Sequence, residues 1–157
     1  MSTVSFQRFA RLTWDGPVVG GSGHVSAGSD SFETGATFPT LRGEPAGTTT
    51  PEELLAASHA VCYGIGLRSV ISREGGTADR IVVVATVTAE KGSEGIRIRS
   101  SHLNGVIHDL KGIGATDLPR IGIVVEQQCT VSAAIRGSVT ISHELSAVES
   151  KLIDERE

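Results

Sequence analysis

The sequence predicts an α+β fold with the element order β-β-(β)-α-β-β-α-β. Short segments in which polar and apolar residues alternate, as they do in strands, come in hairpin-like pairs. Two longer segments carry apolar residues at the three- and four-residue spacing of helices. The strands are grouped between the helices, which argues against an alternating nucleotide-binding fold. We therefore expect antiparallel sheets wrapped around two buried central helices.

The first strands are expected before residue 40. Polar and apolar residues alternate from Phe9 to Trp14, and the residues from His24 to Ser26 form the predicted return strand. The glycine-rich segment from Gly20 to Gly23 joins them. Because no buried strand precedes these glycines and no helix follows, they indicate a turn rather than a phosphate-binding loop. A third strand is predicted from Gly35 to Phe38.

The first helix is predicted to begin at Pro51. The preceding segment from Pro39 to Thr50 contains glycines and a proline and is predicted to be a loop. Thr50 can cap the helix, proline fits its first position, and the carboxylates of Glu52 and Glu53 suit the positive end of the helix dipole. Two glycines at positions 75 and 76 end the predicted helix.

The remaining elements follow the same logic. Residues 80–88 and 96–107 alternate and are predicted to form a hairpin. A second helix is expected to start near Asp117 and to carry Cys129 near its end, with Gly137 as its breaker, and a last strand is expected from Ser138 to Ser146. The whole chain, 1–157, is expected to form a single domain with a loose tail after about residue 149.

Composition excludes several classes of function. The 157 residues include 14 Lys plus Arg and 18 Asp plus Glu, a net charge of −4 that argues against nucleic-acid binding. Hydrophobic residues make up 39 % of the chain, which is typical of a globular protein. No apolar run approaches the ~20 residues of a membrane span, and the N-terminus lacks an apolar signal-peptide core. We therefore expect a cytoplasmic protein that binds no membrane.

The two cysteines, Cys62 and Cys129, are the candidate reactive groups. In a cytoplasmic protein they are not expected to form a permanent structural disulfide, and two cysteines are too few for a zinc site built from cysteine. A lone cysteine on an apolar helix is more often a core residue. Here each predicted helix carries one, and Arg42 supplies a cation shortly before the first helix. A thiolate, a second thiol and a cation are what a peroxide-reducing site needs.

Two motifs carry a resemblance to a known family. The segment from Thr50 to Cys62, the segment from Cys129 to Ser132, and the early Trp14-Asp15-Gly16 resemble the OsmC/Ohr family of osmotically inducible and organic-hydroperoxide-resistance proteins. The resemblance extends from Ala10 to Ser146 and is greater to the OsmC branch. One departure is Thr130, where the family often has proline, and we expect it to loosen the turn that holds the second thiol.

The resemblance implies a thiol-dependent peroxidase that reduces organic hydroperoxides to alcohols. Cys62 would be the peroxidatic cysteine and Cys129 the resolving one. Arg42 would stabilise the Cys62 thiolate, and Glu52 would hold Arg42. No prosthetic cofactor or metal is implied. An external thiol or dithiol would reduce the enzyme again, with a lipoylated protein as one possible donor.

Helix geometry favours Glu52 over Glu53 as the partner of Arg42. At ~100° per residue, Glu52 lies about 80° around the helix from Cys62, whereas Glu53 lies about 180° away. Simple compensation of the helix dipole explains Glu53 fully. His59, which lacks partners at metal-ligand spacing, is expected to be a packed or partly exposed histidine.

Apolar residues around Cys62 are expected to line the substrate mouth. The candidates are Leu55, Val61, Ile65 and Val125. Such a lining favours alkyl or aryl hydroperoxides over hydrogen peroxide. Two other functions remain open: a non-enzymatic module that binds a small apolar ligand between its helices, and another cysteine-nucleophile enzyme such as an acyl-transferase.

The spacing of Glu52 and Cys62 predicts a homodimer with shared active sites. At ~1.5 Å of rise per residue the two side chains are ~15 Å apart along one helix, so they cannot touch. If Glu52 anchors an Arg42 that reaches Cys62, the simplest source of that helix start is a second copy of the chain. The resemblance implies the same intertwined dimer.

Overall fold

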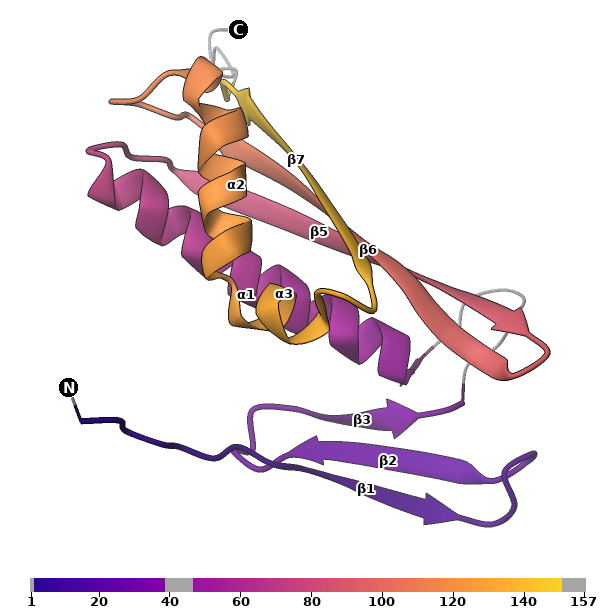
Figure 1. Cartoon of the computed structure of the whole chain (residues 1–157). Helices are drawn as coiled ribbons and strands as arrows, with labels where there is room; N and C mark the ends of the chain where they lie inside the picture. The colour runs from indigo at the N-terminus through magenta and orange to yellow at the C-terminus, as the bar shows by residue number, and fades with distance from the viewer. Residues whose placement is uncertain (1, 39–46, 151–157) are drawn as a thin grey trace, which may run out of the picture. The chain divides into compact units, whose positions relative to one another are not determined.

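The computed structural model describes residues 2–38 and 47–150, which form two compact units, Met1–Leu54 and Leu55–Glu157. The fold class is α+β, as predicted, with one sheet in each unit (Figure 1). Residues 151–157, most of the predicted tail, lie outside the described residues. Each unit is considered by itself below.

The N-terminal unit contains a four-stranded sheet in the order β1-β2-β3-β4. Its strands are β1 (Ala10–Asp15), β2 (Ser22–Ala27), β3 (Glu33–Ala36) and β4 (Thr48–Thr49). The hairpin of β1 and β2 is confirmed, with Trp14 opposite Gly23. A Cβ atom at Gly23 would lie 2.6 Å from the indole ring, so only glycine leaves room for this tryptophan.

Strand β4 corrects the prediction that residues 39–50 form only a loop. Thr48 and Thr49 pair in parallel with Gly35 and Ala36, and the Thr37 N–H donates to the Thr49 carbonyl at 2.9 Å. The residues that break regular structure end at Gly47, whose φ of 75° turns the chain into the strand. Two β-branched threonines then suit the extended conformation.

Helix α1 (Pro51–Arg73) begins and ends where the sequence predicts. The Glu53 N–H donates to the Thr50 hydroxyl at 3.3 Å, which is the expected N-terminal cap. The Thr49 hydroxyl also donates to the Glu53 carboxylate at 2.9 Å. After Arg73 the chain turns at Gly75, which has a φ of 82°.

The C-terminal unit contains a three-stranded sheet in the order β5-β6-β7. The long hairpin of β5 (Arg80–Gly92) and β6 (Gly95–His108) is antiparallel, as predicted. Strand β7 (Thr140–Val148), however, runs parallel to β6. Both sheets of the chain are therefore mixed, and the expectation of purely antiparallel sheets is wrong. Alternation of polar and apolar residues fixes which face a strand buries but not its direction.

The predicted second helix is divided in two. A 3₁₀ turn (Ala115–Asp117) leads into α2 (Leu118–Gln128), and a separate short helix α3 (Thr130–Ile135) follows. Cys129, with φ −70° and ψ 119°, is extended and interrupts the helix. The helical segment therefore breaks first at Cys129, and only its second part ends before Gly137.

Helices α1 and α2 pack on the β5-β6-β7 sheet (Figure 1). The core residues of this unit are Tyr63, Leu67, Val70, Ile71, Leu103, Ile107, Leu118, Ile121 and Val125. Glycine allows close approach: a Cβ atom at Gly122 of α2 would lie 2.8 Å from the imidazole of His143 on β7.

Within the single chain, α1 is buried on one side. Val61 and Ile65 on its other side are 60 % and 68 % exposed. By length and composition alone α1 is also apolar enough to cross a bilayer, because an 18-residue stretch of it has a mean hydropathy of 1.4. Alanine, glycine and serine are interspersed among the apolar residues of α1, so the sequence shows no long uninterrupted apolar run there. Core helices of soluble proteins have the same property, and α1 contributes Tyr63 and Leu67 to the core.

Candidate active site

The fold brings Cys62 and Cys129 together within the C-terminal unit. Cys62 lies in the middle of α1 and is partly buried, and Cys129, 4 % exposed, lies at the junction of α2 and α3. Both are free thiols, and their side chains form a hydrogen bond with one another. The Cys129 sulfur is also the N-cap of α3, because it accepts a hydrogen bond from the Ser132 N–H at 3.5 Å.

The surroundings of Cys62 favour its thiolate. Burial raises its pKa, but hydrogen bonds outweigh this effect and hold the pKa below the ordinary value for cysteine. The donors are the Cys129 side chain, the Thr130 side chain and the backbone N–H groups of Thr130 and Val131. The Thr130 hydroxyl lies 3.5 Å from the Cys62 sulfur.

Cys129 has the opposite tendency. Burial and the hydrogen bond with Cys62 raise the pKa of the Cys129 thiol, although Ser132 acts against them. When one proton is shared between the two sulfurs, it therefore resides on Cys129. These opposite directions favour ionisation of Cys62 over Cys129, which is the preference that nucleophilic attack by Cys62 requires.

Thr130 takes part in the site directly. In the family that the sequence resembles, the residue at this position is often proline, which has neither a hydroxyl nor an N–H group. Threonine supplies both groups to Cys62, and α3 still begins at Thr130. The sequence analysis considered only a looser turn here. The hydroxyl residue directly after the second cysteine is the signal that could have indicated this contact.

The structure describes Glu52, the predicted carboxylate partner, but not Arg42, the predicted cation. Arg42 lies outside the described residues. Glu52 lies in the first turn of α1 and is partly buried. The neighbouring Glu53 accepts a hydrogen bond from the Thr49 hydroxyl, which agrees with its interpretation as a residue of the helix start. The pairing of Glu52 with Arg42 stays a prediction.

The four predicted substrate-contacting residues differ in their exposure to solvent. Val61 and Ile65 line a surface hollow of about 480 Å³, together with Ala60, Gly64, Arg68, Ile81 and Val83. Leu55 is partly buried, and Val125 is 1 % exposed within the core. Of the four, Val61 and Ile65 are thus open to solvent beside the cysteine-bearing part of α1.

His59 is fully buried, whereas the sequence left open whether it is packed or partly exposed. Its Nδ1 atom lies 2.7 Å from the Ser101 hydroxyl on β6, and its Nε2 atom lies 2.8 Å from the Ser132 hydroxyl on α3. Burial lowers the pKa of His59, against a raising influence of Glu126, so the ring is neutral near neutral pH. Residues 101 and 132 are far from 59 in the chain, so sequence spacing gave no signal for this cluster.

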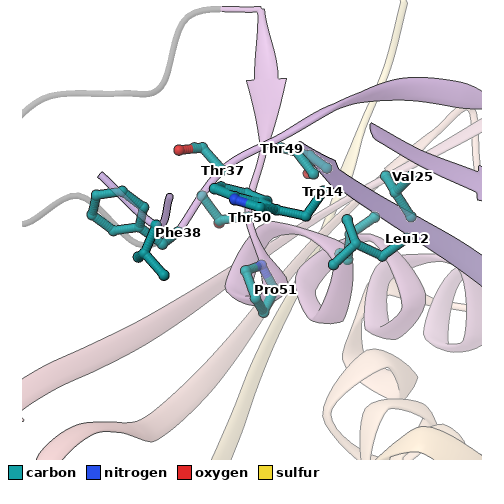
Figure 2. A pocket seen from close by; sticks show the side chains of 11 residues that line it. Leu12, Trp14, Val25, Thr37, Phe38, Thr49, Thr50 and Pro51 are labelled. Carbon is teal, nitrogen blue, oxygen red and sulfur yellow. The ribbon is translucent and has the colours of Figure 1, made fainter. Parts of the chain in front are cut away.

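The N-terminal unit has an apolar pocket of its own (Figure 2). Its volume is about 440 Å³, and it lies between the sheet and the first turn of α1. The lining residues are Leu12, Trp14, Val18, Val25, Ala36, Thr37, Phe38, Thr49, Thr50, Pro51 and Leu54. The sequence analysis placed an apolar ligand between the helices instead. Within the described part of the chain, no group of three potential metal-ligating side chains is found.

Comparison with known proteins places these cysteines in a family context. The family of OsmC-like proteins matches residues 43–144, which include both cysteines and most of α1, β5, β6, α2 and β7. The chain belongs to this OsmC family, as the motifs around Cys62 and Cys129 had indicated.

Individual relatives agree with the family assignment. The chain is 28 % identical over 144 residues to the Escherichia coli protein named peroxiredoxin OsmC, covering 92 % of this chain and all of that one. Among solved structures, an organic hydroperoxide resistance protein of Elizabethkingia anophelis has a TM-score of 0.74 and 23 % identity, over 94 % of this chain and 100 % of that one. The OsmC protein of Legionella pneumophila has a TM-score of 0.73 and 22 % identity, over 92 % and 99 %. These two structures share the fold of this chain.

Proposed function

We propose that this chain is a thiol-dependent peroxidase that reduces organic hydroperoxides to alcohols. The observation that carries the proposal is the hydrogen-bonded pair of Cys62 and Cys129, in which the first sulfur favours the thiolate and the second keeps its proton. The names of relatives, peroxiredoxin OsmC and organic hydroperoxide resistance protein, support the same chemistry.

In the first step the Cys62 thiolate attacks the distal oxygen of the hydroperoxide. The O–O bond breaks, an S–O bond forms, and the alkoxide leaves and takes a proton to become the alcohol. Cys62 is thereby oxidised to a sulfenic acid. The Thr130 hydroxyl and the N–H groups that hold the thiolate keep its sulfur oriented during the attack.

In the second step Cys129 attacks the sulfenic acid of Cys62. An S–S bond forms, the S–O bond breaks, and the departing hydroxide takes the Cys129 proton and leaves as water. An external dithiol then reduces the disulfide by thiolate exchange and is itself oxidised to a disulfide. The cycle needs no prosthetic group. It also needs a reducing compartment, in keeping with the cytoplasmic location that the sequence predicts.

The test is a thiol titration before and after one equivalent of cumene hydroperoxide. The wild-type chain should lose two thiols, Cys62→Ser should lose none, and Cys129→Ser should stop at a sulfenic acid that a dimedone probe traps. Retention of both thiols by the folded wild-type protein would sink the proposal. Full turnover of Cys129→Ser with a dithiol donor would remove the resolving role.

We also propose that the substrate is an organic hydroperoxide rather than hydrogen peroxide. Exposed Val61 and Ile65, one residue before and three residues after Cys62 on α1, offer apolar contact, and each buried CH₂ group contributes ~0.8 kcal/mol at best. The specificity constant kcat/KM should therefore be higher for tert-butyl and cumene hydroperoxide. Equal constants for these and hydrogen peroxide would contradict this preference.

Arg42 and Glu52 complete the proposed site. A guanidinium beside Cys62 would favour the thiolate and orient the peroxide, and Glu52 would hold it. We expect Arg42→Ala to raise the pKa of Cys62 and Arg42→Lys to lower the rate with organic peroxide, because lysine lacks the planar fork. An unchanged pH profile of Cys62 alkylation in Arg42→Ala would show that this arginine is not beside the thiol.

The two other candidate functions have weaker support. The pocket of the N-terminal unit suits a small apolar ligand, but a binding module would lose no thiols in the titration above. An acyl-transferase would need a histidine oriented on Cys62. Both ring nitrogens of His59 instead lie within hydrogen-bond distance of serine hydroxyls.

We propose further that the chain forms a homodimer in which Glu52 and Arg42 of one copy serve Cys62 of the other. Exposed apolar side chains on α1, among them Val61 and Ile65, support an extensive contact. So does the open apolar pocket of the N-terminal unit.

A further inference from the structure

The buried polar cluster around His59 is not used by the mechanism above. His59, Ser101 and Ser132 are each 0 % exposed, and the ring links the two hydroxyls at 2.7 and 2.8 Å. The three residues belong to α1, β6 and α3. His59 lies one turn before Cys62 on α1, and Ser132 lies three residues after Cys129. The imidazole thus joins the two cysteine-bearing segments.

Ser132 connects this cluster to the sulfurs. Its N–H donates to the Cys129 sulfur at 3.5 Å, and its hydroxyl acts as a donor that lowers the pKa of the Cys129 thiol. A serine hydroxyl has one hydrogen. When that hydrogen is directed at Cys129, the Ser132 oxygen must accept from His59.

The hydrogen atoms then follow one direction through the whole cluster. A neutral imidazole has one N–H donor and one acceptor nitrogen. With Nε2–H donating to Ser132, Nδ1 accepts from the Ser101 hydroxyl. Ser132 donates to Cys129, and the Cys129 thiol donates to the Cys62 thiolate. Every donor in this chain has an acceptor, and hydrogen bonds in such a chain strengthen one another.

We propose that His59 is a positioning residue for the second thiol: it fixes the Ser132 hydroxyl as a donor to Cys129 and holds that sulfur beside Cys62. This role deepens the proposed peroxidase function and rests on it for its catalytic consequence. When Cys129 attacks the sulfenic acid, it loses its proton and develops negative charge, which Ser132 stabilises. The same holds when the disulfide is reduced and Cys129 leaves as a thiolate. Loss of the imidazole frees the Ser132 hydroxyl to turn away.

A first experiment needs no peroxide. Cys129 is titrated in a Cys62→Ser background through its thiolate absorbance in the ultraviolet. Cys129 and Glu126 on α2 both raise the pKa of Tyr63 on α1, and Tyr63 and Glu126 stay unchanged in these variants. Adding His59→Leu or Ser132→Ala should raise the apparent pKa of Cys129 by about one unit, which corresponds to a tenfold change in equilibrium.

Two further variants separate this role from general packing. His59→Gln has an amide N–H that can replace Nε2–H, and it should restore part of the shift. Ser142→Ala removes a hydroxyl that is 2.7 Å from another histidine, His102, and it should leave the Cys129 titration unchanged. If His59→Leu does not fold, Ser132→Ala, which removes a single oxygen, still decides. An unchanged Cys129 pKa in folded Ser132→Ala would overturn the proposal.

A second experiment measures resolution. After one equivalent of cumene hydroperoxide, His59→Leu with both cysteines intact should show about a tenfold longer lifetime of the trappable Cys62 sulfenic acid than wild type. The rate at which that acid forms should change by less than about twofold. An unchanged lifetime would contradict the positioning role. If wild type retains both thiols after cumene hydroperoxide, the peroxidase proposal fails, while the titration still tests His59 by itself.

Discussion

Thr130 illustrates how one side chain changes the reactive sulfur. Its hydroxyl lies 3.5 Å from the Cys62 sulfur, and its N–H acts on the same atom. Both are lost when proline, common in the family, stands at this position. The chain therefore has donors to the thiolate that do not depend on Arg42.

We predict that Thr130→Val, which keeps the shape and removes the hydroxyl, raises the pKa of Cys62 by about half to one unit. The pH profile of Cys62 alkylation measures this change. The rate of peroxide consumption at neutral pH should fall by about three- to tenfold, which is the change in the ionisation equilibrium that this pKa shift represents. Thr130→Ser retains the hydroxyl and is the matched control. If Val and Ser variants have the same profile, the hydroxyl has no influence on the thiolate.

Only those parts of the candidate site that depend on residues close together in the sequence could be predicted from it. Cys62 and Cys129 follow from motifs, and the helix start at Thr50 and Pro51 follows from capping chemistry. The hydrogen bonds of His59 join residues 42 and 73 positions apart, so no local pattern encodes them. They exist because β6 and α3 meet α1 in the folded unit.

At the scale of elements, the break between α2 and α3 determines where Cys129 lies. Neither glycine nor proline marks this break, so the sequence placed Cys129 near the end of one helix and located the helix breaker at Gly137. The chain becomes extended at Cys129, whose sulfur caps α3. Likewise, the alternation of residues 138–146 located β7 but contained no information on its parallel pairing with β6.

The capping role predicts a difference between two variants of Cys129. Serine is a preferred N-cap residue, whereas alanine has no acceptor, and the loss of a cap costs about 1 kcal/mol. Under reducing conditions, Cys129→Ala should have a lower free energy of unfolding than Cys129→Ser by about that amount. Urea denaturation measures it. Equal stabilities of the two variants would mean that the cap contributes little.

At the scale of the whole molecule, burial of a neutral His59 couples stability to pH. Its pKa in the folded chain is below the ordinary value of 6.5, so the unfolded chain binds a proton more readily. Stability is therefore fully present above pH 6.5 and decreases as the pH falls below that value. The slope from this group is at most about 1.4 kcal/mol per pH unit.

Urea denaturation from about pH 8 to about pH 5 tests this coupling. His59→Gln should show a flatter dependence than wild type, because the group that titrates is gone. His102→Gln removes a histidine that bonds a serine near the surface and serves as control. The same slope in wild type and His59→Gln would contradict the prediction.

The homodimer is the second prediction at this scale. Sedimentation at micromolar concentration should give about twice the 16.4 kDa mass of one chain, because apolar side chains exposed in the single chain are then covered. Mixing Cys62→Ser with Arg42→Ala should restore part of the activity, since one site of the mixed dimer contains both intact residues. A monomer, or no restoration in verified mixed dimers, would exclude shared sites.

The capping of α3 by a redox-active sulfur has a consequence for its amide protons. In the reduced chain the Ser132 N–H donates to the Cys129 sulfur. Formation of the S–S bond turns the Cys129 sulfur toward Cys62 and away from the Ser132 N–H, so oxidation weakens the first turn of a six-residue helix. Deuterium uptake at residues 130–135 should therefore be faster in the oxidised chain than in the reduced one. The backbone of α3 would then report the redox state of the protein without any substrate or electron donor present.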